Sequence, residues 1–257
     1  AAVAELTRRV VTKPTWLLLV AQGMIGNTPW VAMGAFSPLF FQYLGYSSAQ
    51  VASLFVFQGI AGACGQYLGG VLGDWAHGRD ALHGRVYVAQ TSVLLGMLWT
   101  YALFRYVPRG GDQLHAYATL LVLKGLTCSW CPAGALRPIV ADISDEETRG
   151  FVLGYWLALE GCASAFGAPV VAFLSQDVFG YTPSHLSVDK MDTSTRHANA
   201  AALGEALVWT MVVPWGVCLF FFTLMHCTYP RDLRKMKEEK EQKAAPDNGE
   251  TAELLSA

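Results

Sequence analysis

The sequence predicts an all-α integral membrane protein with six transmembrane helices. Of its 257 residues, 53% are apolar and 15% are charged, whereas soluble domains carry about a quarter charged residues. The mean hydropathy is positive, at +0.32, and six separate stretches are long and apolar enough to cross a bilayer. The net charge of −2 gives no electrostatic reason to expect a nucleic acid as a partner.

Each expected span follows from length and apolar composition. About 20 mostly apolar residues cross a hydrocarbon core of about 30 Å at 1.5 Å per residue. The first, fourth and fifth stretches exceed that length, so we expect tilts or kinks in them, and prolines within the spans favour bends. The six expected spans are residues 15–43, 48–72, 86–107, 114–143, 150–179 and 201–227.

Lys and Arg residues predict that both ends of the chain face the cytosol. In that orientation 12 of the 18 Lys and Arg residues lie on the cytosolic side and 4 on the opposite side, as the positive-inside rule favours. We expect residues 1–14 to be the end of a cytosolic linker, residues 15–229 to be the six-span unit, and residues 230–257 to be a flexible or loosely helical tail. The chain begins without an initiator Met or a signal-peptide pattern, so we expect a fragment of a longer protein.

The stretch GGVLGDWAHGR interrupts the apolar sequence after the second span. Glycines recur every four residues from Gly65 to Gly73, which predicts a face where another helix packs closely. Asp74 follows this face, where a carboxylate can meet backbone N–H groups or the positive end of a helix. We expect Gly78 to permit a turn and Arg79 to supply the counter-charge to Asp74. The plain alternative is a cytosolic loop with positive-inside residues.

These residues resemble the cytosolic signature of the major facilitator superfamily, roughly G-x-L-a-D-x-x-G-R-[KR]. The matching residues are Gly70, Leu72, Asp74, Gly78 and Arg79. One extra residue separates Asp74 from Gly78, and Asp80 replaces the second basic residue. Degeneracy of this sort is common in the family's second copy of the motif, so the resemblance indicates the C-terminal half.

A second stretch, RPIVADISDEETRGFVLG, resembles the turn between the fourth and fifth spans of a half in the same family. Ala141, Asp142, Arg149 and Gly150 fit the pattern A-[DE]-x-x-P-x-x-x-R-G, although its proline is absent. The S-x-x-E spacing after Asp142 also predicts a capping box between Ser144 and Glu147. The overall pattern resembles plant and algal members related to spinster-type transporters.

The resemblance implies a six-helix half-bundle of a 12-helix fold and secondary active transport by alternating access. The cargo is expected to be a small organic solute or a lipid-like molecule. The implied partners are the N-terminal six-helix half, the substrate, a coupling proton or ion and the lipid bilayer, with no cofactor and no enzyme activity. Residues expected at the cytosolic gate are Gly70, Asp74, Gly78, Arg79, Arg137, Asp142 and Arg149.

Two ionisable residues lie deep within expected spans and are candidates for transport or coupling. Burying one charge at the bilayer centre costs about 2.5 to 3.5 kcal/mol, so Lys124 and Glu160 need a cavity or a partner. We expect Glu160 to bind a proton or a cationic group, with Lys124 as its counter-charge or as an anion site. The alternatives are a structural ion pair or a Lys124 side chain that extends towards the headgroups.

Weaker candidates for the transport path are Gln22, which helix packing also explains, and Trp156 and Ser164, which share a face with Glu160.

Other patterns carry less weight. The C-x-x-C spacing of Cys128 and Cys131 lies in an apolar span without a second pair, so we expect no metal site.

An intramembrane protease would need a buried Ser–His or Asp pair, which the spans lack. A non-transporting receptor or scaffold on the same fold remains the alternative function. The segment ETAELL, residues 250–255, matches an acidic dileucine pattern, which leaves the plasma membrane and endolysosomal membranes both open.

Overall fold

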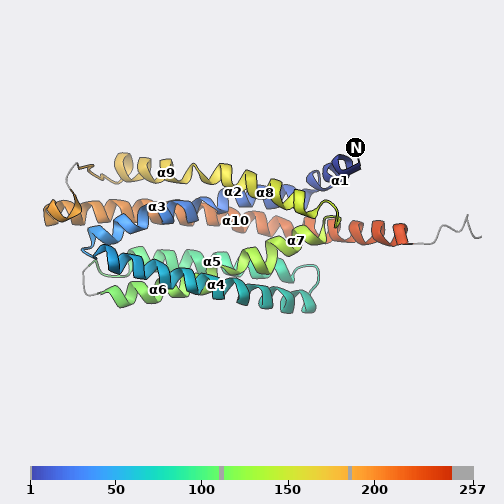
Figure 1. Ribbon diagram of the computed structural model, residues 1–257, viewed down its shortest axis with the longest axis horizontal. Helices are drawn as coiled ribbons and strands as arrows, with labels where there is room; N and C mark the ends of the chain where they lie inside the picture. The colour runs from blue at the N-terminus through green and yellow to red at the C-terminus, as the bar shows by residue number, and fades with distance from the viewer. Residues whose placement is uncertain (1, 110–112, 185–186, 245–257) are drawn as a thin grey trace, which may run out of the picture.

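The computed structural model describes residues 2–109, 113–184 and 187–244, and these residues form helices and connecting turns without a strand. Figure 1 shows the long helices lying roughly parallel to one another. The elements in chain order are α1 (Ala2–Val11), α2 (Pro14–Gly26), α3 (Thr28–Tyr43), α4 (Ser48–Arg79), α5 (Gly84–Arg105), α6 (Leu114–Cys128), the π-helical η2 (Pro132–Leu136), α7 (Arg137–Asp142), α8 (Arg149–Ser164), α9 (Gly167–Phe173), the π-helical η3 (Leu174–Val178), the 3₁₀ turn η4 (Val188–Lys190) and α10 (Thr193–Ala244).

The first expected span is two helices rather than one. α2 ends at Gly26 and α3 begins at Thr28, with Asn27 in a turn between them. Among the described residues, five helical segments are long and apolar enough to cross a membrane: α4, α5, the run from α6 to α7, the run from α8 to η3, and α10. The broken first span is the sixth expected crossing, in two pieces. The cause lies in the sequence, because Pro29 has no backbone N–H with which to continue the helical ladder.

The core forms around α10, which packs against α2, α3 and α5, while α4 packs against α6 (Figure 1). Buried aromatic rings fill the space between α3, α5 and α6. Phe40 packs edge-on against Phe104 at 5.0 Å, and Phe41 packs edge-on against Tyr117 at 5.2 Å. Such edge-to-face pairs stabilise beyond the area that they bury.

The glycine face of α4 packs as closely as its four-residue spacing predicts, which confirms that expectation. A Cβ atom on Gly65 would lie 2.5 Å from the carbonyl oxygen of Gly125 in α6. A Cβ atom on Gly73 would lie 2.6 Å from the Cα atom of Gly134 in η2. Because backbone atoms occupy both positions, only glycine permits this approach of α4 to the helix beside it.

Helix ends differ from two expectations. α4 runs through Gly78 to Arg79, so the turn comes only at Asp80, and the expectation of a turn at Gly78 is wrong. The capping box expected between Ser144 and Glu147 is also wrong, because the Ser144 hydroxyl donates to the carbonyl of Val140 at 2.6 Å and α8 begins only at Arg149.

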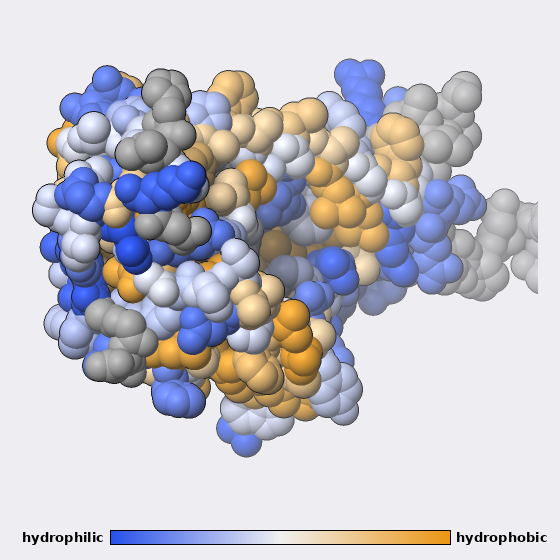
Figure 2. All heavy atoms as spheres, turned by 60° about the vertical axis from the view of Figure 1, so that its left-hand side comes forward, coloured by the Kyte–Doolittle hydropathy of each residue, from blue (hydrophilic) through white to orange (hydrophobic). Residues whose placement is uncertain are grey.

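The last span belongs to one helix that is much longer than the roughly 20 residues needed to cross a bilayer. α10 extends from Thr193 to Ala244, so the described part of the tail is helical. The dileucine pattern at residues 250–255 lies outside the described residues. In Figure 2 hydrophilic residues gather at the end of the bundle opposite to this tail, with more hydrophobic residues behind them. This distribution fits a bundle that crosses an apolar layer.

Candidate functional site

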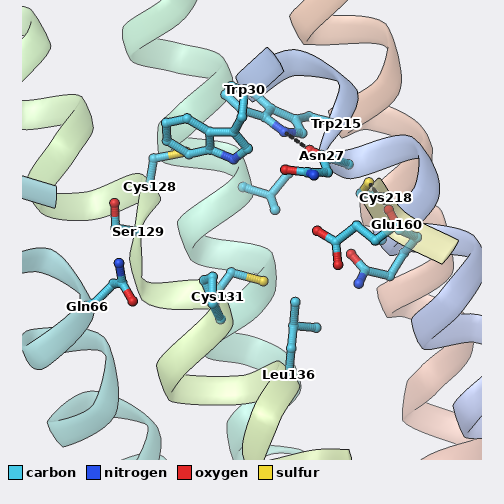
Figure 3. A pocket seen from close by; sticks show the side chains of 15 residues that line it. Asn27, Trp30, Gln66, Cys128, Ser129, Cys131, Leu136, Glu160, Trp215 and Cys218 are labelled. Atoms are coloured by element: carbon cyan, nitrogen blue, oxygen red, sulfur yellow. Dashed lines mark hydrogen bonds between the residues drawn. The ribbon is translucent and has the colours of Figure 1, made fainter. Parts of the chain in front are cut away.

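A cavity of about 300 Å³ lies at the level of the break between α2 and α3. Its walls come from the α2–α3 junction, α4, α5, the segment from the end of α6 through η2, α8 and α10. Figure 3 shows the Glu160 side chain extending from α8 into this space, with Gln66 and Ser129 on the other side of the view. The lining residues are Gln22, Gly23, Gly26, Asn27, Trp30, Gln66, Val93, Cys128, Ser129, Cys131, Pro132, Leu136, Glu160, Trp215 and Cys218.

Side chains of α10 hold the broken span at the cavity. The Trp215 indole donates from Nε1 to the carbonyl oxygen of Gly26 at 3.1 Å (Figure 3). One turn further along α10, the Cys218 thiol donates to the carbonyl oxygen of Gln22 at 3.3 Å. Backbone groups released by a helix break must be satisfied by neighbours in a membrane, and Trp215 does so for the Gly26 carbonyl.

Glu160 is the acidic residue among those lining the cavity. Its side chain is half-buried, and no hydrogen bond or ion pair joins its carboxylate to another described residue. Gly23 gives it room, because a Cβ atom there would lie 3.2 Å from Glu160 Oε2 and 2.8 Å from Trp156 Nε1. Trp156 is buried, and its Nε1 has no hydrogen-bond partner among the described residues. A carboxylate without a protein partner in a cavity has the chemistry to receive a proton or a cationic group.

Lys124 lies apart from this carboxylate. It is 1% exposed and is not among the residues lining the cavity. Its ammonium contacts the Met33 sulfur at 2.7 Å and lies 5.5 and 5.3 Å from the ring centres of Trp30 and Trp215. Aromatic faces and a thioether therefore surround the cation. Within the described ranges no ion pair joins Lys124 to a carboxylate, so the structure does not bring Lys124 and Glu160 together as a pair.

The weaker candidates divide between the cavity and the packing around it. Gln22 lines the cavity, and its side-chain amide donates to the carbonyl oxygen of Leu19 at 3.1 Å. Ser164 is buried away from the cavity and donates to the carbonyl oxygen of Gly161 at 2.9 Å. Asn27 and Trp215 also line the cavity and are not among the site residues expected from the sequence. The Asn-Thr-Pro sequence in a long apolar stretch is the signal that could have found the break.

An electrostatic network ties together the end of the bundle from which α10 projects. Arg85 Nη2 lies 3.3 Å from Asp74 Oδ1, and Arg85 Nε lies 3.8 Å from Asp142 Oδ2. The Tyr229 hydroxyl donates to the same Asp142 oxygen at 2.6 Å. The counter-charge of Asp74 is thus Arg85, and the expectation that Arg79 would supply it is wrong, because the Arg79 guanidinium stacks over Trp75 at 4.3 Å. The network joins α4, α5, α7 and α10.

The remaining residues expected at the gate lie around this network. Arg149 Nη2 donates to the carbonyl oxygen of Ala141 at 3.4 Å, which ties the start of α8 to the end of α7. Arg137 is exposed at the start of α7, and a Cβ atom on Gly70 would meet nothing within 4 Å. Lys13, at the start of α2, donates to the carbonyl oxygen of Ile143 at 3.0 Å. Partial burial lowers the pKa of the Lys13 ammonium, although Glu239 and Asp232 oppose that shift.

Comparison with known proteins places this architecture in a family. The model of the Major Facilitator Superfamily matches residues 18–255, so the chain belongs to that superfamily and is an integral, multi-pass membrane protein. Its fold is similar to the inward-facing, unoccupied crystal structure of a bacterial homologue of the human lysosomal transporter Spinster, with a TM-score of 0.69 at 17% identity. The match covers 89% of this chain and 50% of that one, so the chain spans about half the length of its structural neighbour. The search among curated proteins gives no significant match.

Proposed function

We propose that this chain forms one half of a secondary active transporter that moves a small organic solute or a lipid-like molecule by alternating access. The observation that carries the proposal is the cavity at the break in the first span, into which Glu160 brings a carboxylate that has no hydrogen bond or ion pair with another described residue. Membership of the Major Facilitator Superfamily and the fold likeness to a Spinster homologue support it. In this proposal residues 15–229 are the transporter half, with residues 1–14 and 230–257 on the cytosolic side.

We propose further that a second six-helix bundle packs against α4 and α8. On α4, the exposed small residues Gly59 and Ala63 lie on the face that ends at Asp74. On α8, Gly154 and Gly161 lie on the exposed side, and Cβ atoms there would meet nothing within 4 Å. Small exposed residues at helical spacing are the surface on which another membrane helix packs closely. Since the structural neighbour is twice as long as the matched region, an N-terminal half is the partner that fits this surface.

The proposed role of Glu160 is to bind the coupling proton or a cationic group of the substrate. Glu160→Gln keeps the shape and removes the charge, so substrate uptake should fall to background while the amount of folded protein is unchanged. The measurement is uptake of a panel of solutes and of a fluorescent single-chain lipid into proteoliposomes containing the full-length protein, with and without a proton gradient.

Glu205→Gln is the matched control for this experiment. Glu205 also lies in a span, but its carboxylate pairs with Arg105 at 2.7 Å and is not among the residues lining the cavity. Uptake normalised to folded protein should survive this change. Normal uptake by Glu160→Gln would remove the carboxylate from the mechanism. Binding of a solute without flux in the unmodified protein would favour the receptor or scaffold alternative.

A further inference from the structure

A second pocket, of about 380 Å³, lies beside the electrostatic network at the end of the bundle from which α10 projects. Its lining residues come from the end of α7, the start of α8 and the α10 extension. They are Ala141, Asp142, Arg149, Leu233, Met236, Lys237 and Lys240. This pocket is distinct from the cavity that contains Glu160, because the two share no lining residue.

The charges that line this pocket favour an anion. Arg149, Lys237 and Lys240 bring three cationic side chains to it from two elements. Asp142 is the acidic lining residue, and its Oδ2 atom already accepts from the Tyr229 hydroxyl and lies 3.8 Å from Arg85 Nε. Arg85 is shared between Asp74 and Asp142, and the three cations that line the pocket outnumber its one carboxylate.

Arg149 lines the pocket and has a donor that the described residues leave unused. Its Nη2 atom donates to the carbonyl oxygen of Ala141, which fixes the guanidinium at the pocket. Its Nε atom is buried and has no hydrogen-bond partner among the described residues. A buried donor without a partner costs free energy, and a tetrahedral anion with several acceptor oxygens would satisfy it.

We propose that this pocket binds a phosphate monoester group, either on a lipid headgroup or on a soluble phosphate compound. A phosphate monoester carries about −1.5 to −2 charge at neutral pH and three strong acceptor oxygens, which suits three converging cations. Bound there, it links the α7–α8 turn to the α10 extension. The site does not depend on the transport proposal, because it is defined by binding alone.

The test measures the thermal unfolding midpoint of the full-length protein in detergent micelles. The probes are glycerol 3-phosphate, dioctanoyl phosphatidylinositol 4-phosphate, and dioctanoyl phosphatidylinositol, which has no phosphate monoester. A bound probe raises the midpoint according to its concentration relative to its Kd. Lys237→Gln/Lys240→Gln should weaken apparent binding by roughly 10- to 30-fold.

The matched control is Arg231→Gln/Lys235→Gln, which removes the same charge from residues of α10 that do not line the pocket. At 100° per residue those two side chains project from the other side of the helix. A midpoint shift from a monoester probe that the pocket variant loses and the control keeps supports the site. Whether the lipid or glycerol 3-phosphate gives the shift identifies the source. No shift from either monoester probe, an equal shift from phosphatidylinositol, or an equal loss in the control would overturn it.

Discussion

Substituting Gly73 by alanine tests whether the α4 glycine face sets the position of the cavity wall. A Cβ atom at this position would lie 2.6 Å from the Cα atom and 2.7 Å from the carbonyl carbon of Gly134, whereas carbon atoms pack at about 3.5 to 4.0 Å. The two backbones would therefore have to separate by about 1 Å, because no side chain is there to rotate away. Overpacking of this kind costs about 1 to 3 kcal/mol.

The control for Gly73→Ala is Gly34→Ala, in the interior of α3. A Cβ atom on Gly34 would meet nothing within 4 Å, so this variant gains the helix propensity of alanine, about 1 kcal/mol, without a clash. Both variants receive the same propensity gain, and the difference between them isolates the clash. We expect the unfolding midpoint of Gly73→Ala to lie roughly 2 to 10 °C below that of Gly34→Ala.

The separation of η2 from α4 in Gly73→Ala should also lower transport. Pro132 lines the cavity and opens η2, the element against which Gly73 packs. Moving η2 alters the cavity, so uptake per folded molecule should fall in Gly73→Ala and be retained in Gly34→Ala. Equal midpoints and equal uptake in the two variants would refute the inference that backbone contact at the glycine face sets this wall.

Two further predictions concern buried polar groups. Asp232 is 3% exposed, and its Oδ2 accepts from the backbone N–H of Thr15 at 3.0 Å, so Asp232→Ala should destabilise the protein by about 1 kcal/mol. It should also speed proteolysis near Thr15, and an unchanged cleavage rate would argue against this cap. Lys124→Met replaces a buried cation that has no carboxylate partner with an apolar side chain of similar length, so the unfolding midpoint should be unchanged or higher. A midpoint lower by several degrees would show that Lys124 stabilises the fold through its charge.

The spans and the close helix packing could be predicted from the sequence because they depend on local composition. Apolar length defines a crossing, and glycines at a four-residue spacing define a close approach wherever the partner lies. The depth of Lys124 and Glu160 followed from counting residues along each span. Their directions did not, because the side of a helix that faces a cavity depends on neighbours far away in the chain.

The partner of Asp74 shows the same limit. Arg79 follows Asp74 within the same sequence motif, but α4 continues through Gly78 as a helix. Five residues along a helix turn a side chain about 140° away from the starting direction, so Arg79 stacks on Trp75 instead. Arg85 reaches Asp74 from the next helix, an approach that depends on how α4 and α5 pack.

The interruption at Asn27 gives the first span two independently supported segments. α2 packs on α8 and α10, whereas α3 packs on α9 and α10. A helix without a continuous hydrogen-bond ladder bends more easily at the gap than elsewhere. In the proposed transport cycle, one end of this span would tilt while the other end stays in place, and the hydrogen bond from the indole of Trp215 to the Gly26 carbonyl marks the point about which it would turn.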